Sequence, residues 1–232
     1  MPSIINRVKT GVPGMDKLME GGIPESSVVL LSGGAGCGKT TFSCQFIMEG
    51  LDNGENCLYI TLEESPEDIK KDALQFGWDL GKHESSGAFR IMYYDPFELK
   101  EIITRLKDLI TVNKIKRLVI DSITLFGLYL KEEYNIRKEL YHLVSALKET
   151  GCTALLLSEV TEGDSKKFSR YGVEEFVADG VIVLYYMGLG EGIFRNIEVR
   201  KMRRTKHKNG MFPLALEKNG MKVEADMGSF NN

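Results

Sequence analysis

The sequence predicts an α/β fold in which a mostly parallel central sheet is flanked by helices and followed by an antiparallel hairpin near the C-terminus. Three observations support this prediction. Short apolar runs alternate along the chain with stretches of helical periodicity, the order of a parallel sheet with crossover helices. A glycine-rich loop separates the first apolar run from the first helix. Late in the chain, two apolar runs flank a glycine-rich turn, which is typical of a hairpin.

Each predicted element follows from its residue pattern. Runs rich in leucine and β-branched residues predict buried strands at 28–31, 57–62, 89–94, 118–121 and 154–158. Apolar residues at helical spacing predict helices at 42–48, 66–76, 99–110 and 136–149. Pro66 suits the first turn of the second helix, because its missing N–H has no partner to lose there. The hairpin arms are residues 181–186 and 194–199, joined by the turn at 187–192.

Composition limits the class of protein. The chain of 232 residues carries 30 Lys and Arg against 33 Asp and Glu, so no overall positive field would attract nucleic acid or an anionic membrane. No stretch approaches the roughly 18 apolar residues of a membrane span. The four cysteines show no C-x-x-C spacing, which favours reduced thiols over a metal site or disulfides. We therefore expect a cytoplasmic protein with one domain over residues 1–232, of which 225–232 form a flexible tail.

Residues 33–41, GGAGCGKTT, match the phosphate-binding pattern G-x-x-x-x-G-K-[ST] between an apolar strand and a helix. Glycines allow backbone N–H groups to turn toward phosphate oxygens, and the N-terminus of the following helix adds free donors. Lys39 is expected to reach the β- and γ-phosphates, and the Thr40 hydroxyl to coordinate Mg²⁺. The predicted ATP-binding residues of this loop are Gly34, Ala35, Gly36, Cys37, Gly38, Lys39, Thr40 and Thr41.

Acidic residues follow two of the predicted strands. Asp121 ends an apolar strand, where a carboxylate can meet the Mg²⁺ of a bound nucleotide, although an aspartate in this place can also simply form a turn. Glu63 and Glu64 follow another strand, where hydrolysis needs a base that orients and deprotonates water. They could instead belong to an acidic helix N-terminus. Ser158 and Glu159 end a further strand and could contact the γ-phosphate or serve as ordinary turn residues.

Residues 200–208, RKMRRTKHK, form the densest basic run of the chain. Three interpretations compete: a nucleic-acid patch, a solvated turn, and a set of cations directed at a nucleotide that another subunit binds. The run lies far along the chain from the phosphate-binding loop. From these residues alone, the solvated turn is favoured.

Further short motifs accompany the phosphate-binding loop. They are TGVPGMD at 10–16, GGIP at 21–24, EESP at 63–66, FGWDL at 76–80, IDS at 120–122, RYGVEEF at 170–176 with Asp179, and KMR at 201–203 with Thr205 and His207. Any one motif would be a weak signal, but the combination is specific. Taken together, the motifs resemble a single domain of the KaiC type, a branch of the RecA-like P-loop ATPases, over nearly all of the chain from residue 7 to about 222.

The resemblance implies an ATPase that assembles into a ring, usually of six subunits, with ATP at each subunit interface. Glu63 then corresponds to the water-activating base and Glu64 to its partner. Gln75 and Phe76 match family residues that lie against the adenine. The residues implied to contact the neighbouring subunit's nucleotide are Lys201, Met202, Arg203, Thr205 and His207, of which Lys201 and Arg203 are also implied in catalysis. Because the resemblance is closer to the hydrolytic first domain of KaiC, we do not expect autokinase activity.

The leading functional interpretation is a Mg²⁺-dependent ATPase ring that acts as a regulatory switch or remodeller, with an unknown regulatory protein as its partner. The alternative is a recombinase-like ATPase that handles DNA, which the acidic charge balance argues against. A non-hydrolysing assembly module would not need the glutamate pair. A small-molecule kinase would need a lid and an acceptor pocket that the sequence does not reveal.

Overall fold

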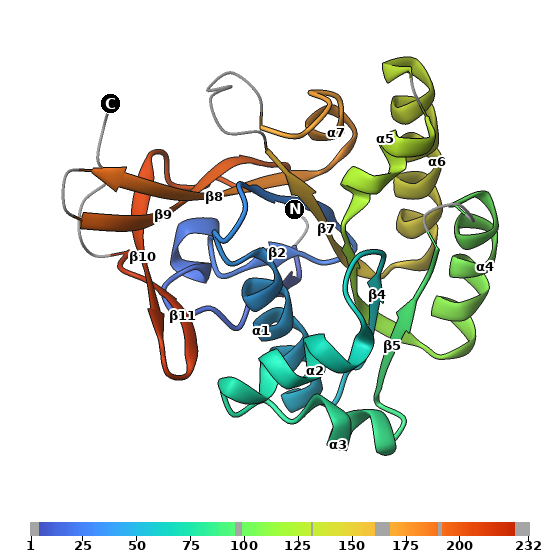
Figure 1. Ribbon diagram of the computed structural model, residues 1–232, viewed down its shortest axis with the longest axis horizontal. Coiled ribbons are helices and arrows are strands. Elements are labelled where there is room, and N and C mark those ends of the chain that lie inside the picture. Colours follow the sequence, from blue (N-terminus) through green and yellow to red (C-terminus); the bar gives the residue numbers. More distant parts are fainter. Residues whose placement is uncertain (1–4, 96–98, 131, 161–167, 190–191, 226–232) are drawn as a thin grey trace.

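The computed structural model describes residues 5–95, 99–130, 132–160, 168–189 and 192–225. Its main sheet has nine strands in the order β11-β10-β9-β8-β3-β7-β6-β4-β5 (Figure 1). From β8 to β5 the strands are parallel, and β9, β10 and β11 continue the sheet in antiparallel fashion. The parallel strands are β3 (Val28–Gly33), β4 (Asn56–Thr61), β5 (Phe89–Tyr93), β6 (Ile115–Asp121), β7 (Thr153–Glu159) and β8 (Gly180–Leu189).

Helices cover both faces of the parallel strands (Figure 1). On one face α1 (Lys39–Asp52), α2 (Pro66–Gln75) and α3 (Leu80–Ser85) pack with Val29 and Leu31 of β3. On the other face α4 (Leu99–Val112) and α6 (Glu133–Thr150) pack with Val28 and Leu30. Successive residues of β3 thus enter two different cores, which explains its continuous apolar run.

The fold class expected from the sequence is confirmed, including the hairpin, whose second arm is β9 (Gly192–Met202). The sequence interpretation missed β10 (Met211–Glu217) and β11 (Gly220–Val223). Pro213 explains the omission, because proline argues against a central strand. β10 accommodates it by pairing with β9 only over Met211 to Pro213 and with β11 only from Leu214 onward.

Several short elements also escaped the sequence patterns, since each is too short to show a period. They are β1 (Arg7–Val8), β2 (Ile23–Pro24), η1 (Asp16–Met19), η3 (Ile123–Leu125), α5 (Phe126–Tyr129), α7 (Glu174–Val177) and the helix α3. No helix within the described part of the chain is long and apolar enough to span a membrane. The expected tail lies outside the described residues from 226 onward.

The topology brings distant parts of the sequence to one edge of the sheet. Parallel strands end at the same edge, and there β3 leads into the phosphate-binding loop. Glu63 and Glu64 follow the end of β4, Asp121 ends β6 and Glu159 ends β7 at the same edge. This edge is where ligands bind in open α/β sheets.

Candidate active site

The phosphate-binding loop connects β3 directly to α1. Gly38 precedes the helix with a φ of 99°. No side chain among the described residues caps the first turn of α1, so its N–H groups remain available to an anion. A Cβ atom on Gly33 would lie 2.5 Å from both the Cys37 sulfur and the Leu184 carbonyl oxygen, so glycine is required there. Because the Cys37 side chain is fully buried, this residue can offer a ligand only its backbone.

Lys39 is held over the loop. Its Nζ atom donates hydrogen bonds to the carbonyl oxygens of Gly33 and Gly34, both at 3.0 Å. These contacts bend the side chain back across the loop, where a bound phosphate would compete for the ammonium group. The loop opens into a pocket of about 370 Å³, lined by Ala35, Gly36, Gly38, Lys39, Thr40, Thr41, Glu63, Glu64, Asp72, Asp121, Ser122, Glu159, Arg195 and Leu216.

Asp121 and Thr40 supply two neighbouring oxygen ligands in this pocket. The Thr40 hydroxyl donates to Asp121 Oδ2 at 3.2 Å, and the Tyr59 hydroxyl donates to the same oxygen at 2.7 Å. Burial raises the pKa of Asp121 to about 6, an effect that these hydrogen bonds oppose and that the charges of Glu63 and Glu64 reinforce. A hydroxyl and a carboxylate are ligands that Mg²⁺ prefers, so the residues present fit this ion.

The glutamate pair lies between β4 and α2. The N-cap of α2 is Ser65, whose hydroxyl accepts from the Asp68 N–H, and the acidic residues of the first turn are Glu67 and Asp68. Glu63 therefore lies outside the helix, and its Oε1 accepts a hydrogen bond from the Ser122 hydroxyl at 2.6 Å. This bond fixes Glu63 beside Asp121.

Glu64 has an unusually acidic setting. Partial burial and then the nearby charges of Asp72, Glu63 and Asp68 raise its pKa.

At the end of β7, Glu159 lines the pocket but Ser158 does not. The Ser158 side chain is buried and its hydroxyl is 3.4 Å from Glu174 Oε1, so it contacts α7 rather than the pocket.

Arg195 is a pocket residue that the sequence interpretation missed, together with Asp72 and Leu216. Its guanidinium stacks on Tyr186, 4.7 Å from the ring centroid, and its buried Nε has no hydrogen-bond partner within the described part of the chain. A buried guanidinium N–H without a partner is costly, so a ligand anion would be favoured beside it. The only signal for Arg195 in the sequence was the alternation of apolar and polar residues along its strand. That signal was not sufficient, because it does not show which strand lies next to the phosphate-binding loop.

The basic run lies at the opposite edge of the sheet. Lys201 pairs with Val181 and Met202 with Gly180, and Gly180 pairs with Val29 near the beginning of β3. β3 rises about 3.3 Å per residue, so this end is more than about 10 Å from the phosphate-binding loop at its other end. Neither Lys201 nor Arg203 lines the pocket of its own chain.

Lys201 and Arg203 are both anchored beside α7. The Lys201 Nζ donates to the carbonyl oxygens of Glu175 at 2.9 Å and Ala178 at 2.6 Å, and burial lowers the pKa of Lys201. Arg203 donates through Nη1 to Asp179 Oδ1 at 3.1 Å, while its backbone N–H donates to the Asp179 carbonyl at 2.9 Å. The rest of the Arg203 side chain is exposed.

Comparison with known proteins places this geometry in a family. A model of the KaiC ATPase family matches residues 8–227. The chain belongs to the KaiC family of ATPases. It is 37% identical to a UPF0273 protein of Pyrococcus furiosus, over 96% of both chains. It is 35% identical to the circadian clock protein KaiC3 of Synechocystis, over 91% of this chain but 44% of that protein.

The fold agrees with a solved member of the family. The crystal structure of the KaiC-like protein PH0186 from the hyperthermophilic archaeon Pyrococcus horikoshii matches with a TM-score of 0.87 and 41% identity, covering 95% of this chain and 99% of that one. The chain thus spans less than half of the clock protein but nearly all of these shorter relatives.

The other residues that the resemblance to KaiC implied to contact a nucleotide lie away from the pocket. Met202 is buried against Gly180, so only its backbone could reach a nucleotide. The Thr205 hydroxyl accepts a hydrogen bond from Arg7 at 2.9 Å, and His207 lies on the same exposed segment. Gln75 and Phe76 end α2, where Phe76 stacks on Trp78 at 4.9 Å. Trp78 in turn contacts the turn at Gly220 between β10 and β11.

Proposed function

We propose that this KaiC-family ATPase is one Mg²⁺-dependent ATPase domain, that it assembles head to tail into a hexameric ring, and that the ring acts as a nucleotide-dependent regulatory switch or remodeller. The observation that carries the proposal is the position of Lys201 and Arg203. They lie at the edge of the sheet opposite the phosphate-binding loop and so are suited to a neighbouring subunit's nucleotide. Head-to-tail contacts of this kind close into rings.

In the proposed reaction, Lys39 and the loop N–H groups hold the β- and γ-phosphates of ATP. Thr40 and Asp121 would hold Mg²⁺, which neutralises charge on the phosphates. Glu63, oriented by its 2.6 Å hydrogen bond from Ser122, takes a proton from the attacking water. The water oxygen bonds to the γ-phosphorus while the bond between this phosphorus and the bridging oxygen breaks, which leaves ADP and phosphate. Lys201 and Arg203 of the adjacent subunit stabilise charge on the transferring phosphoryl group.

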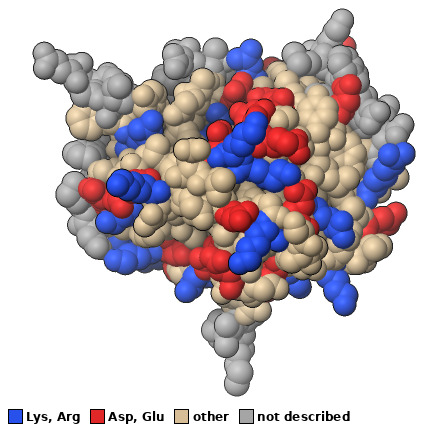
Figure 2. Space-filling model, turned by 60° about the horizontal axis from the view of Figure 1, so that its bottom comes forward, with Lys and Arg blue, Asp and Glu red and all other residues tan. Residues whose placement is uncertain are grey.

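A DNA-handling ATPase is less well supported. On the face shown in Figure 2, Lys and Arg are interspersed with Asp and Glu rather than forming a continuous basic surface. Within the basic run, Lys201 and Arg203 are engaged with α7 and Asp179. Arg204 donates to the Ser27 hydroxyl at 3.1 Å. These cations are therefore partly neutralised or anchored, which weakens the case for a phosphate-backbone site.

The test mixes two inactive variants. Glu63→Gln is expected to bind ATP but to hydrolyse it at least about a hundredfold more slowly, the scale of losing a general base. Arg203→Ala is expected to be nearly inactive because the adjacent site loses its arginine. An equal mixture should regain activity, since about a quarter of interfaces in a random ring join an intact Glu63 to an intact neighbouring Arg203. Fluorescence measures whether the two variants exchange subunits. If they exchange subunits and the mixture still does not regain activity, the shared site is refuted.

A further inference from the structure

A groove of about 740 Å³ lies between α6 and α7. Aromatic side chains of unusual exposure line it: Tyr134 is 73% exposed, Tyr141 61% and Phe176 60%. Large aromatic side chains gathered at one exposed site are typical of protein interfaces. Arg203, one of the two cations at the far edge of the sheet, also lines this groove.

The groove is positively charged. Among the residues that the structure describes, its lining includes Arg137, Lys138, Lys148 and Arg203 and no acidic side chain. The buried Asp179 beneath it accepts from both Lys148, at 2.8 Å, and Arg203, at 3.1 Å, so one carboxylate serves two cations. Arg137 and Lys138 are exposed, and the Arg137 guanidinium lies 5.7 Å from the Phe176 ring centroid. The groove therefore presents net positive charge beside exposed aromatic side chains.

The opposite charge gathers on one side of the nucleotide pocket, at α2. Glu63, Glu64, Glu67, Asp68 and Asp72, here called the acidic rim, lie in or beside the first turns of α2 and are all exposed. Lys70 and Lys71 compensate only part of this charge, because Lys70 also pairs with Glu84 at 2.8 Å and Lys71 pairs with Asp68 at 3.0 Å. The raised pKa of Glu64 reflects, after burial, the mutual repulsion of rim carboxylates.

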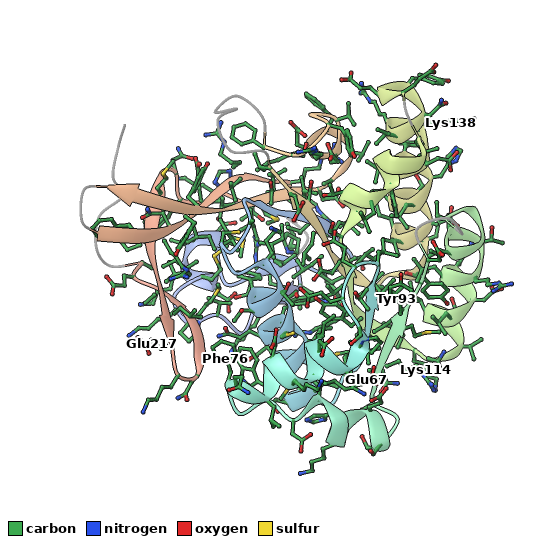
Figure 3. All side chains as sticks on the ribbon, viewed as in Figure 1. Glu67, Phe76, Tyr93, Lys114, Lys138 and Glu217 are labelled. Carbon is green, nitrogen blue, oxygen red and sulfur yellow. The ribbon has the colours of Figure 1, made fainter. Side chains whose placement is uncertain are left out.

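We propose that the α6–α7 groove of one subunit docks on the acidic rim of the next copy of this chain. The inference rests on the proposed function, in which Arg203 reaches the adjacent nucleotide pocket. Arg203 lines the groove, and Glu63, Glu64 and Asp72 of the rim line the pocket. An Arg203 that reaches the pocket from its α2 side would therefore bring the groove and the rim together. Their opposite charges then favour the contact, and the aromatic side chains become buried. Lys138 on the groove and Glu67 on the rim lie on different sides of one molecule (Figure 3), so the contact joins two molecules.

The experiment reverses charge on each surface without touching the proposed catalytic side chains. The groove variant is Arg137→Glu with Lys138→Glu, and the rim variant is Glu67→Lys with Asp68→Lys, two rim residues that do not line the pocket. The control, Lys114→Glu with Lys116→Glu, makes the same charge change as the groove variant on residues elsewhere on the surface (Figure 3 labels Lys114). Circular dichroism verifies that each variant is folded. Assembly is measured by mass photometry over a concentration series with Mg²⁺ and a non-hydrolysable ATP analogue.

Each reversed protein alone is expected to need at least about tenfold higher concentration to assemble, since it places like charges against each other. The control should assemble as the wild type does. An equal mixture of the groove and rim variants should assemble again with alternating subunits, because both kinds of interface in such a ring join opposite charges. Normal assembly of either reversed variant, no rescue on mixing, or a wild-type protein that stays monomeric would overturn the inference.

This outcome is separable from the proposed function. A wild-type protein that assembles through these surfaces but does not hydrolyse ATP would refute the ATPase and leave the docking supported. Suppose instead that the mixture of Glu63→Gln and Arg203→Ala regains activity, but the charge-reversed variants assemble normally. This pair of results would refute the docking and leave the proposed function supported.

Discussion

Replacing Asp121 by asparagine is expected to stabilise the protein at neutral pH in the absence of metal and nucleotide, while it weakens Mg²⁺-dependent hydrolysis. Asp121 is largely buried beside Glu63 and Glu64, so its charge is unfavourable until a cation binds. Both hydrogen bonds to the side chain, from Tyr59 and Thr40, reach the same oxygen, Oδ2. The carbonyl oxygen of an asparagine side chain could accept both, so the substitution removes charge and keeps the contacts.

The magnitude follows from the pKa of Asp121. A rise from 3.8 to about 6 on folding means that the folded state holds the proton more tightly. The unfolding free energy of the wild type therefore falls as pH rises from about 4 to about 6, and the loss is complete above about pH 7. At 1.36 kcal/mol per pH unit this loss is about 3 kcal/mol. The side chain of the Asp121→Asn variant would not titrate, so we expect the advantage of this variant to be about 1 to 3 kcal/mol at pH 8 and to vanish near pH 4.

Urea unfolding with EDTA at several pH values between 4 and 8 measures the difference in unfolding free energy between Asp121→Asn and the wild type. Groups that titrate in the same way in both proteins cancel in this difference. Asp179→Asn is the matched control, because the pKa of Asp179 is lowered rather than raised. Burial alone would raise this pKa, but hydrogen bonds from Lys148 and from the Val28 N–H outweigh the effect of burial. This control should lose stability at pH 8. The reasoning would be refuted if the Asp121→Asn protein is no more stable than the wild type at pH 8. It would also be refuted if the difference in unfolding free energy between the two proteins is the same at every pH.

Three further outcomes are expected. Lys39→Ala should weaken ATP binding at least about tenfold, measured by titration with a fluorescent analogue, since a hydrogen bond to a charged group contributes about 1.5 to 3 kcal/mol. Arg195→Ala should lower kcat about tenfold to a hundredfold, whereas Arg200→Ala, on the same strand but outside the pocket, should not. Titration of single- and double-stranded DNA should show no tight binding. A steep salt dependence that is lost when Arg204 and Lys206 become alanine would instead favour a DNA-handling enzyme.

The sequence predicted the middle of the parallel sheet because its strands contain continuous apolar runs with both faces buried, as Val28 to Leu31 show. The outermost strand β5 differs, since Arg90 and Tyr93 are exposed there. The sequence interpretation missed β10, where buried Phe212 and Leu214 flank Pro213. A proline within a short alternating run is evidence against a strand unless its pairing partner is known. The partner changes at this residue, and that change depends on long-range pairing that no local pattern records.

Much of the candidate site was predictable for a related reason. In a parallel sheet every strand ends at the same edge, so residues following β3, β4 and β6 had to lie together once those strands were recognised. Arg195 was not predictable in this way. It comes to the pocket because Tyr186 pairs with it while Leu184 of the same strand pairs with Gly33, a register that depends on β8 lying next to β3.

The same register separates the two ends of β9. Because β8 runs parallel to β3 and β9 returns antiparallel, Arg195 lies near the phosphate-binding loop of its own chain, while Lys201 lies near the opposite edge of the sheet. The extended chain between them spans about 20 Å. In the proposed ring, one strand therefore supplies cations to two successive nucleotide sites. A change in β9 caused by a ligand at one site would then move the cations presented to the next, which gives the ring a direct physical route for coupling between subunits.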